Sequence, residues 1–119
     1  MTITRSQLLP LVTLSFTLGV ATPLLCADQD AALVAKGKEV YAAQKCSTCH
    51  SIAGEGKKTN PLDGVGKKLS ADDIRAWIVD PKGMTTKSKS TKKPPMPAKY
   101  SKLPPADIDA LVAYMQSLK

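Results

Sequence analysis

The chain has 119 residues and carries 17 Lys and Arg against 10 Asp and Glu, for a net charge of +7. This length suits one small domain, and 4% aromatic residues give it a thin apolar core for its size. A basic chain can bind nucleic acid, but seven of the 15 lysines lie in one polar segment, residues 82–102, with no aromatic platform for stacking bases, so we exclude a nucleic-acid partner.

The first 27 residues have the pattern of a secretory signal peptide. Arg5 precedes an uncharged apolar run over residues 8–21, and small residues follow as far as Ala27. The run is shorter than the ~20 apolar residues that a spanning helix needs, and Pro23 follows it. We therefore expect cleavage after Ala27.

The expected mature domain covers residues 28–119, without a membrane span, and lies in the periplasm or on the outer face of the cytoplasmic membrane. An uncleaved N-terminal anchor is one alternative. Lipidation of Cys26 is another, although Leu25 stands where a small residue is expected before such a cysteine.

A first helix is predicted from about Ala31 to Gln44, with Asp30 as its cap. One face of this helix carries Leu33, Gly37, Val40, Tyr41 and Gln44 at helical spacing. A glycine in mid-helix costs ~1 kcal/mol relative to alanine. We therefore expect a second helix to cross closely at Gly37.

The segment Cys46-Ser47-Thr48-Cys49-His50 reads C-x-x-C-H, the attachment signature of a c-type haem. Two intervening residues let both sulfurs reach two vinyl groups of one ring, and the adjacent imidazole turns in below the iron. A dithiol redox pair or a small disulfide would leave His50 without a role, and a zinc site would need two more ligands. We predict one covalent haem c on Cys46 and Cys49, with His50 as an iron ligand.

Residues 51–69 are predicted to be a loop, since glycines and a proline interrupt them without periodicity. Ser70 begins a second helix, in which Ser70 and Asp73 have capping-box spacing and Pro81 ends the helix at Asp80. Its apolar stripe consists of Ile74, Trp77 and Ile78.

Residues 82–102 form a long polar segment that is rich in lysine and contains Pro94-Pro95-Met96-Pro97. Loops this long are uncommon in small domains unless they are functional or disordered. A last helix starts at Pro105. Its apolar stripe is Ile108, Leu111, Val112, Met115 and Leu118. Because no strand pattern is convincing, the predicted class is all-α.

A methionine opposite the histidine would close the sixth iron position and raise the reduction potential, as suits electron transfer. Met115 lies on the last helix's apolar stripe, where a core role is more common. Met84 follows Pro81 closely and is the second choice. Met96 lies between three prolines that stiffen the backbone around it, so we predict Met96 as the second axial ligand.

With this motif, an all-helical pattern and the late Met-Pro pair, the mature chain resembles the class I cytochromes c. The resemblance implies the small cytochrome c fold, in which three main helices wrap around one covalently attached haem. Four family positions are matched by Gly37, Tyr41, Leu111 and Tyr114, and others by Ile74, Trp77, Ile78 and Pro81. It further implies that Trp77 and Ile78 pack against the haem.

One departure lies after the haem motif. The family has Pro-x-Leu-x-Gly, in which the proline carbonyl accepts the N–H of the proximal histidine, whereas Pro61 here directly precedes Leu62. Either Asn60 or Pro61 could supply that carbonyl to His50. We assign Pro61 to the haem pocket with Trp77.

The predicted function is that of a soluble monohaem electron carrier between respiratory redox partners, not an enzyme. Lysines near Met96 would steer it to an acidic face of a membrane oxidase, reductase or dehydrogenase. An electron-transfer haem subunit of a dehydrogenase or oxidase complex is the alternative. A haem enzyme or gas sensor would need an open sixth position, against which Met96 argues.

Overall fold

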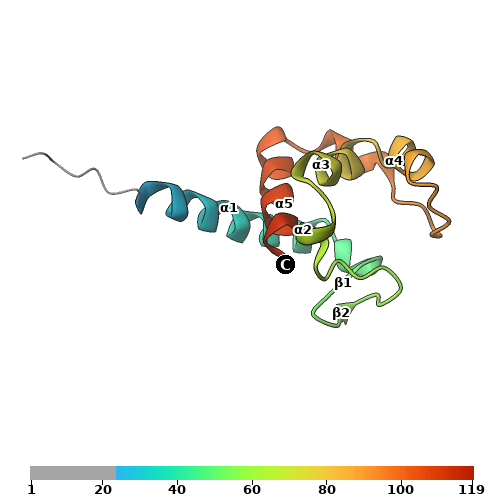
Figure 1. Ribbon diagram of the computed structural model, residues 1–119, viewed down its shortest axis with the longest axis horizontal. Helices are drawn as coiled ribbons and strands as arrows, with labels where there is room; N and C mark the ends of the chain where they lie inside the picture. Colours follow the sequence, from blue (N-terminus) through green and yellow to red (C-terminus); the bar gives the residue numbers. More distant parts are fainter. Residues whose placement is uncertain (1–23) are drawn as a thin grey trace, which may run out of the picture.

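The computed structural model describes residues 24–119, with side chains from residue 30 onward, so most of the predicted signal peptide lies outside the described residues. Most of this region is helical (Figure 1). The elements in order are α1 (Leu24–Ala43), the 3₁₀ helix η1 (Cys46–Thr48), β1 (Ser51–Ile52), β2 (Glu55–Gly56), α2 (Val65–Lys68), α3 (Ala71–Val79), α4 (Pro81–Lys87), the 3₁₀ helix η2 (Ala98–Lys102) and α5 (Pro105–Ser117). None of the helices from residue 24 onward is long and apolar enough to cross a membrane.

The centre of the fold is the crossing of α1 and α5 (Figure 1). A Cβ on Gly37 would collide with the Ala110 carbonyl and lie 2.6 Å from the Cβ of Tyr114. Next to this contact, the rings of Tyr41 and Tyr114 meet edge to face with their centroids 5.8 Å apart. The close helix crossing predicted at Gly37 is therefore confirmed, and only glycine fits there.

The start of α1 differs from the prediction. The helix begins at Leu24, so Asp30 lies inside it and does not cap it. Leu33 is 37% exposed rather than packed. Both differences follow from the length of α1, which extends well beyond its crossing with α5 (Figure 1).

The predicted cap of α3 is confirmed, since Ser70 Oγ accepts a hydrogen bond from the Asp73 backbone N–H at 3.1 Å. The prediction that coil follows Asp80 is wrong. Pro81 starts α4, and the Asp80 carboxylate accepts a hydrogen bond from the Gly83 N–H at 3.0 Å. Proline suits a first helical turn because its missing N–H would have no partner there. Together, α4 and η2 order about half of the segment that was predicted as a polar loop.

Residues 51–69 are also more ordered than predicted. A minimal antiparallel hairpin pairs Ser51 with Gly56 and Ile52 with Glu55. Its turn residues, Ala53 and Gly54, both have positive φ, at 50° and 82°, which suits a tight hairpin turn. α2 then follows before α3, so residues 24–119 are mainly helical, with one hairpin of two residues per strand.

The buried core joins side chains from α1, α3 and α5. Its members are Val40, Ile74, Ile78, Ile108, Leu111, Val112 and Met115. These positions include most of the two apolar stripes predicted for α3 and α5. Half-buried side chains from the connecting segments, Met96 and Leu62 among them, pack against this cluster.

Candidate functional site

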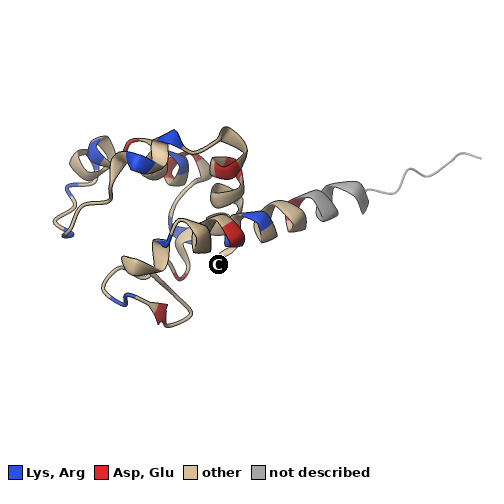
Figure 2. Ribbon diagram, turned by 180° about the vertical axis from the view of Figure 1, so that it is seen from behind, with Lys and Arg blue, Asp and Glu red and all other residues tan. Residues whose placement is uncertain are grey.

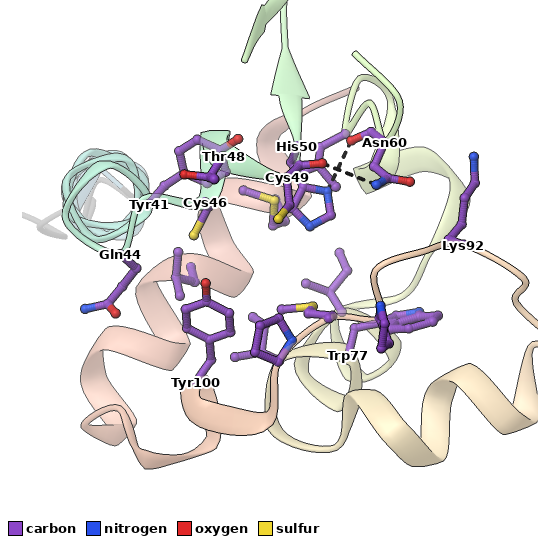
Figure 3. A pocket seen from close by; sticks show the side chains of 18 of the residues that line it. Tyr41, Gln44, Cys46, Thr48, Cys49, His50, Asn60, Trp77, Lys92 and Tyr100 are labelled. Carbon is purple, nitrogen blue, oxygen red and sulfur yellow. Dashed lines mark hydrogen bonds between the residues drawn. The ribbon is translucent and has the colours of Figure 1, made fainter. Parts of the chain in front are cut away.

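A cavity of about 530 Å³ lies between the Cys46–His50 segment and the segment that carries Met96 (Figure 3). Its size falls within the ~300–1,000 Å³ of ordinary small-molecule sites. The apolar part of its wall consists of Leu62, Val65, Leu69, Ile74, Trp77, Ile78, Leu111 and Met115. Several of these residues also belong to the buried core, so the cavity lies against the centre of the domain.

The first wall of the cavity is built by the tight turn of η1. The backbone N–H groups of Cys49 and His50 both donate to the Cys46 carbonyl, at 3.1 and 3.0 Å. This turn brings two thiols and one imidazole to the cavity side of the chain (Figure 3). Both thiols are unbonded and half-buried, and burial raises the pKa of the Cys46 thiol. In residues 30–119, no three His, Cys, Asp or Glu side chains gather as a metal site would require.

His50 is oriented by one hydrogen bond. Its Nδ1–H donates to the Asn60 carbonyl at 3.1 Å, which leaves Nε2 available on the cavity side. Burial lowers the pKa of His50, and the Asn60 contact opposes this in part. The ring is therefore held neutral at pH 7, which is the form that binds a metal ion.

The carbonyl next to the histidine belongs to Asn60 and not to Pro61. Pro61 is bridged to Ser51 and does not line the cavity, whereas its neighbour Leu62 does. The place that we assigned to Pro61 in the pocket is thus taken by Asn60 and Leu62. Pro61 has no N–H, so the backbone hydrogen bond that ties this segment to Ser51 comes from the Leu62 N–H, which donates to the Ser51 carbonyl at 2.8 Å.

The opposite wall contains Met96. It lies in the coil between α4 and η2, is half-buried and lines the same cavity as His50. Met115 also lines the cavity but belongs to the α5 core. Met84 is 8% exposed and does not line the cavity. Trp77 and Ile78 both line it, as the resemblance implied.

Four contributions to the cavity were not predicted. The Asn60 side-chain amide donates to the Cys49 carbonyl at 3.3 Å (Figure 3). Lys92 Nζ donates to the Thr59 carbonyl at 3.3 Å. The hydroxyl of Tyr41 is buried with no hydrogen-bond partner among the described side chains. Desolvation raises its pKa to about 12. Tyr100 also lines the cavity, from η2. Only the Asn60 contact could have been anticipated from the sequence, because Asn60 occupies the position at which the family pattern has a proline.

Residues 34–119 match the family model described as cytochrome c, which covers more than half of the chain. The chain belongs to the cytochrome c family. Its helical fold and its C-x-x-C-H segment agree with this membership, which makes the protein an electron-transfer haem protein that carries covalently bound haem c.

Over 96 residues this cytochrome is 29% identical to the cytochrome c oxidase subunit 2 of Alkalihalophilus pseudofirmus (strain ATCC BAA-2126 / JCM 17055 / OF4). That alignment covers 73% of the chain but 26% of the relative, so the chain spans about a quarter of that protein's length. No solved structure matched the chain.

The cavity of this cytochrome fits a haem in chemistry as well as in size. Two thiols and a neutral imidazole lie on one wall, a thioether on the other, and apolar side chains between them. The apolar side chains that line the cavity leave surface that a flat apolar group would cover, and covering it would add to the stability of this small domain.

Proposed function

We propose that this cytochrome is a soluble monohaem carrier that takes up and delivers single electrons between respiratory redox proteins. The observation that carries the proposal is the joint presence of both thiols, His50 and Met96 on the wall of one apolar cavity. A His/Met pair closes the iron to substrates and raises its potential, and haem c supplies the Fe(III)/Fe(II) couple. No other chemistry is required of the chain.

In this proposal, each residue has a physical task. The thiols of Cys46 and Cys49 would hold the haem covalently, through thioether bonds to its two vinyl groups. His50 is the proximal ligand, held in its tautomer by the Asn60 carbonyl, and Met96 is the second ligand. The apolar wall, including Trp77, keeps water away and so favours the less charged ferrous form.

Lysines are well placed for docking to an acidic partner. Lys45, Lys92 and Lys99 line the cavity and are exposed. Figure 2 shows basic residues both on the arm that carries α3 and α4 and on the opposite arm. No acidic residue interrupts residues 81–102. Such a field raises the association rate with an acidic face and is screened by salt.

The docking proposal can be tested by the rate of electron transfer to an acidic redox protein at increasing ionic strength. Neutralising Lys45, Lys92 and Lys99 to Gln should slow the reaction at low salt and flatten its salt dependence. The matched control neutralises Lys38, Lys58 and Lys67, which are exposed but do not line the cavity. Equal effects of the two triple variants would contradict docking through the cavity edge.

A second candidate function is that of an electron-transfer subunit or domain of an oxidase. It is favoured by the similarity to a cytochrome c oxidase subunit 2, of which the chain spans about a quarter. Gel filtration of native extracts, prepared with and without detergent, separates the two. A carrier elutes alone in both, whereas a subunit elutes with a large complex.

We further propose that the chain is exported and cleaved after Ala27, since haem c is attached outside the cytoplasm. N-terminal sequencing of the haem-bearing protein from the periplasmic fraction should then begin at Asp28. A retained N-terminus, or a mass that shows a lipid on Cys26, would replace this proposal with one of the two anchored alternatives.

A further inference from the structure

Asn60 makes contacts to three consecutive residues of the haem-binding segment. Its carbonyl accepts hydrogen bonds from His50 Nδ1–H at 3.1 Å and from Ser51 N–H at 3.3 Å. Its side-chain amide donates to the Cys49 carbonyl at 3.3 Å. Figure 3 shows the contact of Asn60 with the His50 ring and the contact of its side-chain amide with Cys49. One residue thus holds the backbone on either side of the proposed iron ligand and the imidazole of the ligand itself.

The hydrogen bond from the Asn60 side chain to Cys49 restrains a stretch of backbone that has few other restraints. Asn60 lies in coil between β2 and α2, and its own N–H is held only by a long 3.5 Å contact to the Lys57 carbonyl. A proline would restrict this backbone through its fixed φ, but asparagine does not. In the described chain, no backbone N–H outside the helices and strands donates to the Cys49 carbonyl. The Asn60 amide therefore restrains its own backbone and satisfies that carbonyl at the same time.

Resting on the proposed function, we propose that the Asn60 side chain is a positioning residue for His50. By fixing Asn60 to Cys49, its amide sets the distance between the Asn60 carbonyl and His50 Nδ1–H. A short, well-aligned hydrogen bond at Nδ1 makes the imidazole a stronger electron donor at Nε2. Stronger donation stabilises the ferric state. The side chain thus lowers the reduction potential and fixes the ring's rotation, although it touches neither the iron nor the ring.

Two variants test the positioning role of Asn60, and each perturbs the site in a different additional way. Asn60→Ala removes the amide and some packing, while Asn60→Asp keeps the shape but replaces the donor by an acceptor facing the Cys49 carbonyl. Because Asn60→Asp adds a charge, Thr59→Asp is the matched control: Thr59 is adjacent and exposed, and its side chain makes no contact with Cys49 or His50. Thr59→Ala is the uncharged control.

The first readout is the exchange rate of the His50 Nδ1 proton in the reduced protein, measured by NMR. We expect exchange to be at least ~10-fold faster in both Asn60 variants, in line with the size of effects from residues behind a metal ligand. The Thr59 variants should exchange at the wild-type rate. The second readout is the midpoint potential, which should be higher in Asn60→Ala than in wild type and higher in Asn60→Asp than in Thr59→Asp.

The proposal is overturned if both Asn60 variants exchange the His50 Nδ1 proton at the rate of their Thr59 controls and have the same midpoint potentials as those controls. If Asn60→Ala does not fold, Asn60→Asp against Thr59→Asp decides alone. Before these measurements, covalent haem and the sulfur-to-iron band are checked in wild type. Their absence would contradict the proposed function itself, whereas their presence with unaltered Asn60 variants contradicts only the positioning role.

Discussion

The two walls of the cavity are held by different kinds of interaction. The wall with His50 is a dense set of short-range hydrogen bonds, from the η1 turn to the Asn60 contacts ten residues away. The wall with Met96 is coil between α4 and η2, in which Pro94, Pro95 and Pro97 have no N–H to donate. Its position depends on packing against the core and on the fixed φ of the prolines.

This difference predicts how the site responds to perturbation. A ligand fixed by hydrogen bonds on its own segment stays in place until that segment unfolds. A ligand on a loop is released when the loop opens, which costs less free energy than global unfolding. We therefore expect the His50 wall to be the rigid half of the site and the Met96 wall the labile half.

The largest effect is expected from removing the attachment on the rigid wall. In the double variant Cys46→Ala/Cys49→Ala, the haem has no covalent link to the chain. The cavity of about 530 Å³ then no longer holds a covalently attached group. Because the apolar side chains around the cavity then have no covalently held partner, the chain should lose stability and helical circular dichroism, and it should carry no haem in a denaturing gel. A helical, stable double variant without haem would contradict this account of the core.

The second prediction separates the methionines. Met96→Ala should abolish the sulfur-to-iron absorption band and lower the reduction potential, while haem stays attached. Met84→Ala is the matched control, since Met84 is buried outside the cavity. It should cost about 2–5 kcal/mol of stability, as buried methionines do, but keep the band. If the band were lost in Met84→Ala but kept in Met96→Ala, Met84 and not Met96 would be the iron ligand.

The third prediction concerns Tyr41, whose buried hydroxyl has no partner among the described residues. Tyr41→Phe should raise the free energy of unfolding by on the order of 1 kcal/mol, because it removes a desolvated polar group. Burial raises the pKa of Tyr41 from 10.0 to about 12. Ionisation of Tyr41 is therefore disfavoured in the folded state, so the effect of its hydroxyl on stability is constant below pH 10, and the free energy of unfolding falls as the pH rises from 10 toward 12.

Denaturation with urea at several pH values measures both effects. Wild type should lose more stability than Tyr41→Phe between pH 10 and 12. Tyr114→Phe is a second test in the same helix crossing, since burial raises the pKa of Tyr114 as well and its removal should also reduce the loss of stability above pH 10. A lower stability of Tyr41→Phe at pH 7 would mean that the hydroxyl has a partner in the holoprotein.

The smallest effect tests the labile wall directly. Lys92 joins the Met96 segment to the His50 side through its 3.3 Å contact with the Thr59 carbonyl, and such exposed contacts are worth less than about 1 kcal/mol. In a urea titration, the sulfur-to-iron band should disappear before the helical signal does. Lys92→Ala should widen that gap by shifting only the band, and Lys93→Ala should not. If the band and the helical signal were lost together in every variant, the claim that the Met96 wall opens before the His50 wall would be wrong.

The sequence predicted those parts of the molecule whose cause is local. The cap at Ser70, the crossing at Gly37 and the segment Cys46–His50 depend on a few adjacent residues or on one steric fact. It did not predict α4, because Pro81 can either end one helix or begin the next. The choice depended on Asp80, whose side chain caps α4.

The choice between the Asn60 and Pro61 carbonyls also lay beyond the sequence. It depends on the path by which residues 51–69 come back to lie beside His50. The hairpin that begins at Ser51 determines that path. Since this hairpin has two residues per strand, it leaves almost no alternating pattern to read. The side-chain contact of Asn60 could be seen only once the two segments were placed together.

The most direct test of the whole account is the visible spectrum of the purified, reduced protein, taken before and after denaturation. We expect a sharp α-band of the c type, and haem that stays with the chain through a denaturing gel, because Cys46 and Cys49 hold it covalently. A colourless protein, or haem that is extracted on denaturation, would contradict covalent haem at Cys46–His50.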